Sequence, residues 1–228
     1  MQSSKSYIKE IFTSIQGEGI FVGYKQLFIR FTKCNLSCEY CDTDFVQDSL
    51  TKSYTPQELI EEIKKYDTKN IHSISLTGGE PLLDSDFLKE FLPLTKNKIY
   101  LETNGTLTKE LKKVINFIDY VSMDIKLDSS SKNTDLFEVH DEFTKICLKN
   151  NKIIFYKVVF DENITDEEIK KTTELAQKHN VTIILQPLML GNKIKPSSQT
   201  ILKVTDKFIE KHQETRLIPQ VHKFLNVE

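Results

Sequence analysis

Apolar positions along the chain change their spacing repeatedly from about residue 26 onward. Short apolar runs typical of strands are followed by longer stretches in which apolar residues recur every three or four positions, as in amphipathic helices. The predicted strands are 26–31, 71–76, 98–102, 120–125, 152–160 and 181–186. The predicted helices are 55–66, 85–92, 108–118, 136–150, 165–180 and 198–212.

Two of these helices open with capping boxes. Thr55 precedes Pro56 and Glu58 at the first of them, and Thr165 precedes Glu168 at the other. A hydroxyl followed three residues later by a glutamate satisfies the exposed amides of a first helical turn, and proline suits the first helical position. Both helix starts are therefore predicted with defined boundaries.

Alternation of strands and helices predicts a parallel sheet built from βαβ units. No Pro-, Gly- or Ser-rich linker, low-complexity tract or repeat divides the 228 residues, so we expect one domain. About six β/α units are fewer than the eight of a closed barrel. The expected fold class is α/β, an open, partial β/α barrel.

Polar or glycine-rich segments follow five of the predicted strands. They are residues 34–41, 77–81, 102–106, 122–124 and 186–189. In barrels and open α/β sheets alike, sites form at the carboxyl ends of the strands. We therefore expect these segments to line one rim.

Composition limits the classes of partner and the cellular location that we expect for the protein. Thirty-one Lys and Arg against thirty-three Asp and Glu give a net charge of −2, which argues against nucleic acid as the main partner. Residues 1–12 lack an apolar signal core, and no run of about 18 apolar residues is present to span a membrane. With four cysteines, a secreted disulfide framework is not expected. The expectation is a soluble protein of the cytoplasm.

Three of the four cysteines, Cys34, Cys38 and Cys41, lie within eight positions. A structural zinc site takes four Cys or His ligands, and the fourth cysteine, Cys147, lies in a helical apolar pattern and is expected to be buried. Iron–sulfur clusters take one thiolate per iron, so three would leave one iron open to a substrate or cofactor. The incomplete ligand set favours the cluster over zinc.

This loop resembles the cluster motif of radical S-adenosylmethionine (SAM) enzymes, C-x3-C-x2-C with an aromatic residue, here Tyr40, before the last cysteine. The segment TGGEP (77–81) is similar to the Gly-Gly-Glu-Pro motif of that family. The resemblance implies a radical SAM core, a 4Fe–4S cluster on the three cysteines, and SAM on the open iron. Glycine lets a ligand approach the backbone, so Gly79 is expected to meet the methionine ammonium, with Glu80 supplying negative charge nearby.

The flanking segments resemble the 7-carboxy-7-deazaguanine synthase family within these enzymes. The matching residues are SIQGEG (14–19), Arg30, CDT (41–43) and QVHKFL (220–225), and the likeness runs from about residue 8 to residue 228. It implies one core domain over 1–228, with a short N-terminal substrate-binding segment and a C-terminal strand and tail. It also implies ring contraction of a small-molecule pterin, 6-carboxy-5,6,7,8-tetrahydropterin, to 7-carboxy-7-deazaguanine with loss of ammonia, in queuosine and 7-deazapurine biosynthesis. A flavodoxin or ferredoxin reductant and a homodimer are implied as well.

By the same resemblance, a set of residues is expected to bind the substrate: Ile15, Gln16, Gly17, Arg30, Thr77, Gln220, His222 and Glu228. Gln16 would pair with the amide edge of the pterin, and Arg30 would pair with its carboxylate. Thr43 matches the position that ligates Mg²⁺ in the family, and a hydroxyl is a suitable hard ligand. A helix N-cap is the alternative role for Thr43.

Contacts to SAM are expected at Tyr40, Cys41, Asp42, Gly79, Glu80, Glu102, Ser122, Met123, Asp124, Gln186, Pro187, Leu188 and Met189. One departure stands at the fourth strand end, where many relatives have Ser-Pro-Lys and this chain has SMDIK (122–126). The roles of Asp124 and Lys126 therefore stay open between a cofactor contact and a solvated strand end.

Two other functions compete with this hypothesis. A glycyl-radical enzyme activase has the same cluster chemistry but a protein substrate. A non-catalytic iron–sulfur or zinc protein would need a full ligand set, which the sequence lacks. Residues 14–19, Arg30 and 220–223 favour the small pterin substrate.

Overall fold

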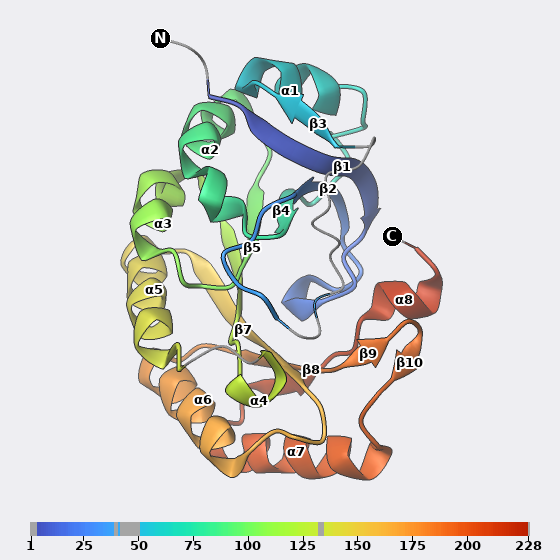
Figure 1. Ribbon diagram of the computed structural model, residues 1–228, viewed down its shortest axis with the longest axis vertical. Coiled ribbons are helices and arrows are strands. Elements are labelled where there is room, and N and C mark those ends of the chain that lie inside the picture. The colour runs from blue at the N-terminus through green and yellow to red at the C-terminus, as the bar shows by residue number, and fades with distance from the viewer. Residues whose placement is uncertain (1–3, 39–40, 42–50, 132–134, 228) are drawn as a thin grey trace.

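A computed structural model describes residues 4–38, 41, 51–131 and 135–227. One nine-stranded sheet runs through this part of the chain in the order β11-β8-β7-β6-β5-β4-β2-β1-β3 (Figure 1). Its strands are β1 (Ser6–Ile15), β2 (Lys25–Phe31), β3 (Lys52–Tyr54), β4 (Ser73–Gly78), β5 (Ile99–Thr103), β6 (Tyr120–Asp124), β7 (Ile153–Phe160), β8 (Ile183–Pro187) and β11 (Thr215–Leu217). A separate hairpin pairs β9 (Met189–Leu190) with β10 (Lys193–Ile194).

From β2 to β11 the neighbouring strands all pair in parallel, in chain order. β1 extends the sheet antiparallel to β2, and β3 pairs antiparallel with β1. Within the described residues β3 and β11 are the two edge strands, so the sheet does not close on itself. The predicted open, partial barrel is confirmed.

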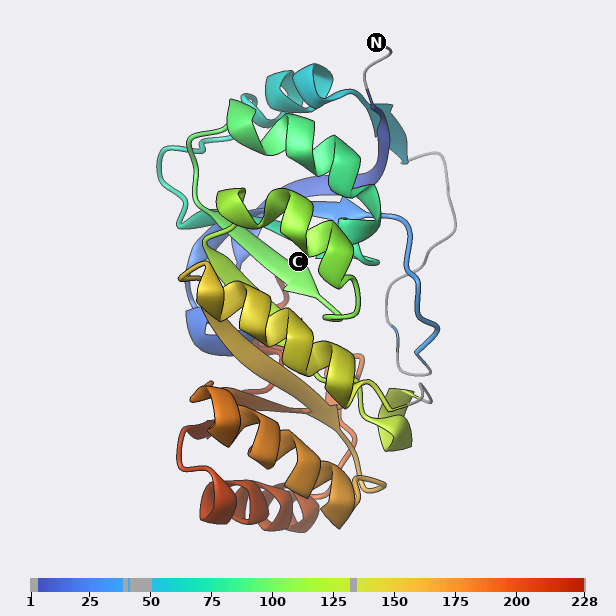
Figure 2. The same ribbon diagram turned by 90° about the vertical axis from the view of Figure 1, so that its left-hand side faces the viewer.

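The helices are α1 (Pro56–Ile63), α2 (Ser85–Phe91), α3 (Thr108–Val114), α4 (Asp128–Ser131), α5 (Phe137–Lys149), α6 (Asp166–His179), α7 (Ser198–Lys211) and α8 (Val221–Leu225). Four 3₁₀ turns accompany them within the described residues: η1 (Gly19–Phe21), η2 (Pro81–Asp84), η3 (Leu92–Leu94) and η4 (Ile115–Phe117). Helices α1, α2, α3, α5, α6 and α7 each connect successive parallel strands, and Figure 2 shows them as one layer in chain order over the outer face of the sheet. No helix among the described residues has the length and apolar character to cross a membrane.

Side chains alternate between the two faces of the parallel strands, and each face has its own packing. Outward residues such as Ile29, Leu101 and Val158 are fully buried in the core between sheet and helices. The inward face carries an aromatic cluster at the amino ends of the strands. This barrel plug consists of Tyr100, Tyr120, Phe155 and Ile184, packed by Ile20, Phe21 and Ile218.

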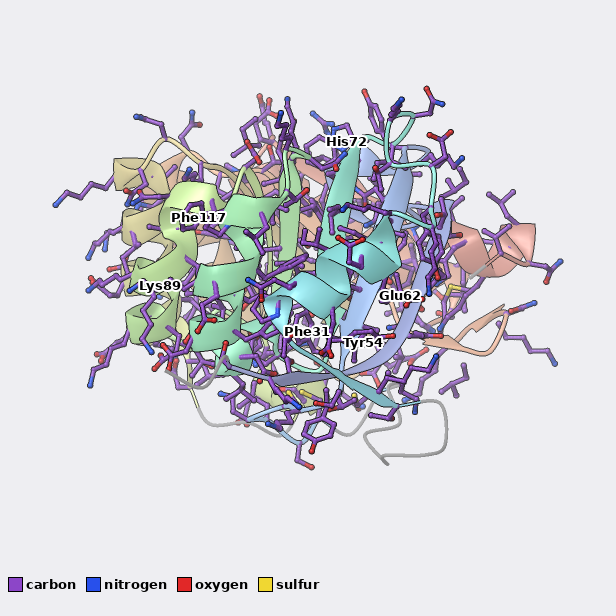
Figure 3. All side chains as sticks on the ribbon, turned by 90° about the horizontal axis from the view of Figure 1, so that it is seen from above. Phe31, Tyr54, Glu62, His72, Lys89 and Phe117 are labelled. Atoms are coloured by element: carbon purple, nitrogen blue, oxygen red, sulfur yellow. The ribbon has the colours of Figure 1, made fainter. Side chains whose placement is uncertain are left out.

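Polar side chains occupy the inward positions at the other end of the strands. His72, just before β4, and Phe31, at the end of β2, mark the two ends on opposite sides of the view in Figure 3. The register places Thr77 opposite Arg30 and Asp124 opposite Lys157. The amino end of the barrel is thus filled by rings, and its carboxyl end is polar.

Both predicted capping boxes are present. The Thr55 and Thr165 side chains accept hydrogen bonds from the backbone amides of Glu58 and Glu168. In return, the side chains of these glutamates accept hydrogen bonds from the backbone amides of the two threonines. Each predicted helix and each predicted strand has an observed counterpart, shifted by a few residues at its ends. β1, β3, the β9–β10 hairpin, β11, α4 and α8 are not among the elements predicted from the periodicity.

Candidate active site

A cavity of about 460 Å³ lies at the carboxyl ends of the parallel strands. β1, the segment that follows it and residues 220–222 complete the walls that the parallel strands begin. The expected site residues that line it are Ile15, Gln16, Gly17, Arg30, Cys34, Cys38, Cys41, Thr77, Gly79, Glu102, Asp124, Gln186, Leu188, Met189, Gln220 and His222. The rim expected from the sequence is therefore one continuous enclosure.

Cys34, Cys38 and Cys41 all line this cavity and form no disulfide. Burial raises the pKa of the Cys34 thiol, and the nearby Glu80 and Cys38 add to the rise, while the amide of Leu36 opposes it. Cys147 lies in α5, fully buried in the outer core, where burial raises its pKa to about 12. The three clustered thiols are thus separated from the fourth, as the sequence predicted.

The TGGEP turn after β4 supports the start of the cysteine loop. The Glu80 amide donates to the Lys33 carbonyl at 2.6 Å, and the Gly79 amide donates to the Phe31 carbonyl at 3.1 Å. A Cβ on Gly79 would lie 1.9 Å from the Lys33 carbonyl oxygen, and Gly78 has a φ of +105°. The glycines are therefore needed for this close approach between two backbone segments, whether or not they also leave room for a ligand.

Glu80 itself does not line the cavity. Its fully buried carboxylate accepts hydrogen bonds from the Leu82 amide, the Thr103 hydroxyl and the Asn104 amide. Burial raises its pKa to about 7, against the lowering effect of these hydrogen bonds. Its observed contacts tie the end of β4 to the end of β5.

A closed ring of hydrogen bonds joins the cysteine loop to the loop after β5. Asn104 Nδ2 donates to Asn35 Oδ1 at 2.8 Å, and Asn35 Nδ2 donates to Thr106 Oγ1 at 2.9 Å. Thr106 Oγ1 donates back to Asn104 Oδ1 at 2.6 Å. Below the ring, His140 Nε2 lies 3.0 Å from the Asn104 carbonyl, which can only accept, so Nε2 carries the proton.

Glu102, at the carboxyl end of β5, is held from three sides. It accepts from Gln16 Nε2 at 3.2 Å, Ser75 Oγ at 2.9 Å and Thr77 Oγ1 at 3.2 Å. Burial raises its pKa, and Glu18 adds to the rise, while Lys157 opposes both. Thr77 and Glu102 were expected to contact different ligands, and the structure bonds them to each other.

Lys157 is the centre of a charge network that was not predicted. Its ammonium lies 2.6 Å from Glu18 Oε2 and 3.1 Å from Asp124 Oδ1, and Asp124 Oδ2 lies 2.6 Å from Lys126 Nζ. Burial works against the charge of Lys157, yet Asp124, Glu18 and Glu102 raise its pKa well above the usual range. The sequence signal was a lysine inside the otherwise apolar strand 153–160. Asp124 and Lys126, left open above, form an ion pair at the cavity.

The segment after β1 is fastened to residues 220–222. The Val221 amide donates to the Gly17 carbonyl at 2.9 Å, and Gln220 Nε2 donates to Glu18 Oε1 at 2.8 Å. A Cβ on Gly17 would lie 2.2 Å from His222 Nδ1, so a glycine is required for this contact. Two segments some two hundred residues apart therefore form one wall of the cavity.

Arg30 lines the cavity beside two stacked aromatic rings. Its Nε is paired with Glu10 Oε1, and its guanidinium lies 5.6 Å from the centroid of the Phe12 ring. Phe12 and Phe28 stack with their ring centroids 5.0 Å apart and their planes inclined by 8°. The neighbouring strands β1 and β2 thus supply a flat apolar surface edged by a cation.

Among the expected cofactor contacts, Cys41, Gly79, Glu102 and Asp124 line the cavity, as described above, and Glu80 does not; the others divide into three groups. Gln186, Leu188 and Met189 line the cavity. Met123 points into the outer core, and Ser122 and Pro187 are buried outside the cavity lining. Tyr40 and Asp42 lie outside the described residues, as do Thr43, the expected magnesium ligand, and Glu228, an expected substrate contact.

The residues present fit a radical SAM cofactor set on two observations. Cys34, Cys38 and Cys41 line one cavity as free thiols, and thiolates are the ligands that hold iron–sulfur clusters. Gln186 Oε1 is buried at the cavity without a hydrogen-bond partner among the described residues. A donor on a bound ligand would satisfy it, because an unpaired buried acceptor is costly.

Comparison with known proteins gives the family. The model of the radical SAM superfamily matches residues 28–196. A 7-carboxy-7-deazaguanine synthase of Geobacter sulfurreducens is 35% identical over 99% of this chain and 99% of its own. The synthase of Archaeoglobus fulgidus is 35% identical over 96% of this chain and 97% of its own.

Among solved structures, QueE from Escherichia coli aligns with a TM-score of 0.62 at 19% identity, covering 96% of this chain and 95% of that one. A radical SAM methyltransferase from Sphaerobacter thermophilus aligns with a TM-score of 0.67 at 11% identity, over 86% of this chain and 66% of that one. At these identities the structures show the fold. The family model spans most of the chain and the named synthases nearly all of it, so the chain belongs to the radical SAM superfamily and, within it, to the 7-carboxy-7-deazaguanine synthase family.

Proposed function

We propose that the protein converts 6-carboxy-5,6,7,8-tetrahydropterin to 7-carboxy-7-deazaguanine, with release of ammonia, on the route to queuosine and related 7-deazapurines. One observation carries the proposal: the three thiols and both expected substrate segments, 15–17 and 220–222, line the same cavity. The named synthases, which match nearly the full chain, favour a small substrate over the protein substrate of an activase and favour an enzyme over a non-catalytic iron–sulfur or zinc protein.

The cofactor set that the family implies is a 4Fe–4S cluster with SAM. In our proposal Cys34, Cys38 and Cys41 hold the cluster, and the wall formed by Gly79 and Gln186 receives SAM. When bound, these groups supply a radical that takes hydrogen from C6 of the substrate. The chain's own contribution is to place the substrate, to exclude water and to fix charge around it.

The substrate would lie against the wall formed by β1 and β2. The stacked rings of Phe12 and Phe28 offer a flat apolar surface of the kind that planar rings pack against. Arg30 would pair with the substrate carboxylate while Glu10 keeps its guanidinium oriented. Gln16 lines the cavity and stays a proposed substrate contact, and its side-chain amide is also bonded to Gln26, Glu102 and the Glu18 amide.

A magnesium ion on the Thr43 hydroxyl is a further part of the proposal, supported by the resemblance of CDT (41–43) to the family. One neutral protein ligand makes binding weak until the substrate carboxylate joins it. Mg²⁺ is expected to raise turnover strongly and to leave the substrate-free enzyme unchanged. Thr43→Val should abolish most of that stimulation with iron content intact, and undiminished stimulation would move the metal elsewhere.

The remaining expectations rest on the family resemblance alone and stay proposals. They are a flavodoxin or ferredoxin reductant, a homodimer and a cytoplasmic location. The oligomeric state can be measured by sedimentation, and the reductant by comparing turnover with purified flavodoxin and ferredoxin.

Anaerobic reconstitution followed by mass spectrometry of the products tests the function directly. The carboxytetrahydropterin should yield 7-carboxy-7-deazaguanine and ammonia. Substrate deuterated at C6 should pass its label into recovered SAM. Consumption of SAM without label transfer, or no deazaguanine product, would refute the proposal.

A further inference from the structure

Cys34 is held on both of its sides by the segments that follow β4 and β5. The carbonyl of Lys33, just before it, accepts a hydrogen bond from the Glu80 amide at 2.6 Å. The side chain of Asn35, just after it, uses both its oxygen and its nitrogen in the hydrogen-bonded ring with Asn104. Because Asn35 is exposed, these hydrogen bonds rather than burial fix its side chain.

One backbone amide of this segment is directed at the Cys34 sulfur. The Leu36 amide donates to Cys34 Sγ, with 3.5 Å between nitrogen and sulfur. This N–H belongs to the peptide group that follows Asn35, so the backbone dihedral angles of Asn35 set its direction. By fixing Asn35, the ring therefore also fixes the donor to the sulfur.

Asn104 is the rigid end of the ring. The residue is 5% exposed, its amide donates to Glu80 Oε2 at 2.8 Å, and its carbonyl accepts from His140 Nε2 at 3.0 Å. Both of its main-chain groups are thus held independently of its side chain, which reaches Asn35. Truncation of the Asn104 side chain should release Asn35 and leave these main-chain contacts in place.

A hydrogen bond to a cluster thiolate favours the reduced cluster. One-electron reduction adds negative charge to the cluster and its sulfur ligands, and an N–H donor stabilises that charge. Loss of the donor therefore lowers the reduction potential. Entry of water has the opposite effect, since a more polar environment stabilises the more highly charged reduced state. The sign of a change in potential thus separates loss of the N–H donor from general loosening of the loop.

We propose that Asn35 and Asn104 are positioning residues that raise the reduction potential of the cluster by holding the Leu36 N–H on the Cys34 sulfur. A higher potential means that a larger fraction of the cluster is reduced at a given potential of the electron donor. The inference rests on the cluster of the proposed function and is independent of the pterin substrate.

Potentiometric titration of the reconstituted enzyme, followed by electron paramagnetic resonance of the reduced cluster, tests the proposal without SAM or substrate. At the potential that reduces half of the wild-type cluster, Asn104→Ala should raise the ratio of oxidised to reduced cluster about two- to tenfold, the range for one hydrogen bond. Asn97→Ala is the matched control and should leave the ratio unchanged, because that amide bonds to Thr68 and Thr95 instead. A ratio that stays constant or falls in Asn104→Ala, or that rises equally in both variants, would overturn the proposal.

Replacing the Leu36 amide by an ester, through incorporation of the α-hydroxy acid of leucine, removes this N–H and keeps the side chain. The ester variant should show the same lowering of the potential. Adding Asn104→Ala to it should lower the potential no further, because both changes act through one donor. Additive shifts, or no shift in the ester variant, would overturn the proposal. If Asn104→Ala does not retain iron, Thr106→Val opens the ring at Asn35 Nδ2 and takes its place.

The result is distinguishable from that of the proposed function. Unshifted potentials in the variants of an enzyme that forms 7-carboxy-7-deazaguanine would refute this inference alone. The expected shifts in an enzyme that forms no such product would support this inference and refute the function.

Discussion

Gly79 and Gly17 each leave room for another part of the chain. Gly79 admits the Lys33 carbonyl just before the first cluster cysteine, and Gly17 admits His222. No positive φ is involved at either position, so the requirement is one of space. The glycines of both motifs thus allow one segment to pack closely on another, a role that the sequence motif alone does not reveal.

Gly79→Ala is expected to displace the start of the cysteine loop. The added Cβ would lie 1.9 Å from a backbone oxygen, which cannot rotate away as a side chain could. We expect substoichiometric iron after reconstitution, measured by iron and sulfide analysis. Gly191→Ala is the control: nothing lies within 4 Å of its Cβ, and its φ of +56° adds backbone strain without a clash, away from the cysteine loop. Full iron content in Gly79→Ala would contradict the docking role.

His140 is predicted to make stability depend on acid pH. Burial lowers its pKa from 6.5 to about 4, although the bond to Asn104 opposes this. The unfolded chain binds the proton first, so the free energy of unfolding falls as the pH drops from 6.5 towards 4. By pH 5 the loss amounts to about 2 kcal/mol.

His140→Asn keeps a donor near the Asn104 carbonyl and removes the titrating group. The wild type should exceed this variant in Tm at pH 7 by more than at pH 5, with the gap shrinking by about 4–8 °C. Measuring the difference between two proteins cancels acid loss of the cluster. A gap that stays constant with pH would show that another group titrates.

Individual contacts at the site were the least predictable from sequence. The three cysteines could be recognised from their spacing, because all of them lie in one short segment of the sequence. The hydrogen bonds from Gln16 to Gln26 and Glu102 were not predicted, because the positions of these two partners depend on strand register. Lys157 was visible only as a charge in an apolar strand, and its ion-pair partners, Glu18 and Asp124, come from two other segments.

Among the elements, the loop after β5 acts as a dock for the cysteine loop. The Asn35–Asn104–Thr106 ring fixes the stretch between Cys34 and Cys38 to a loop whose own amide is held by Glu80. Each amide of the ring both donates and accepts, so orientation as well as distance is specified. The loop is therefore positioned by the fold before any cofactor binds.

Asn35→Ala should accelerate loss of iron to a chelator several-fold, because two of the ring's hydrogen bonds disappear. Asn97→Ala is a matched control: that amide also bridges two loops, to Thr68 and Thr95, away from the cysteines. Release kinetics followed by absorbance of the chelator complex provide the measurement. Equal rates for both variants would assign the ring to general stability.

Elements with local signals were predicted well, and among the strands that were missed, β1 was missed for a physical reason. The capping boxes fixed the starts of α1 and α6 from a few adjacent residues. In β1 the pairing register shifts between Ile8 and Glu10, which is a bulge at Lys9. Ile8 and Ile11 consequently share the core side at a spacing of three, and the period-two signal of a strand is lost.

At the scale of the whole molecule, the barrel plug closes one end and leaves the site at the other. Tyr100, Tyr120 and Phe155 fill the interior, and η1 packs Phe21 against them directly after Glu18. Access to the cavity is therefore expected from the carboxyl ends of the strands. A reaction through a radical benefits from such a one-ended enclosure, because water is excluded from below.

Phe155→Ala should lower stability by about 3–5 kcal/mol, since the ring is fully buried. This corresponds to a Tm lower by roughly 6–20 °C, measured by thermal denaturation, with iron content unchanged. Phe117→Ala is the control, because that ring is 37% exposed in the helical layer where Figure 3 marks it. A small effect at Phe155 would mean that the plug is loosely packed.

The architecture followed from the sequence more fully than the site did. Strand–helix alternation is a repeated local signal, and the open barrel is its consequence. The joining of residues 16–18 to 220–222 depends on where the sheet brings its ends, which no local pattern states. Family resemblance placed both segments at the substrate as an expectation, and the structure shows the hydrogen bonds that join them.

The hydrogen bond between Glu18 and Gln220 also limits when the cavity can be completed during synthesis of the chain. The two residues are 202 positions apart, so at about 5–20 residues per second a ribosome makes the first about 10–40 s before the second. During synthesis the β/α units can form one after another while this wall of the cavity is still missing. The nascent protein can thus form most of its sheet, up to β8, before its pocket is complete, and cluster insertion at that stage would meet a half-open site.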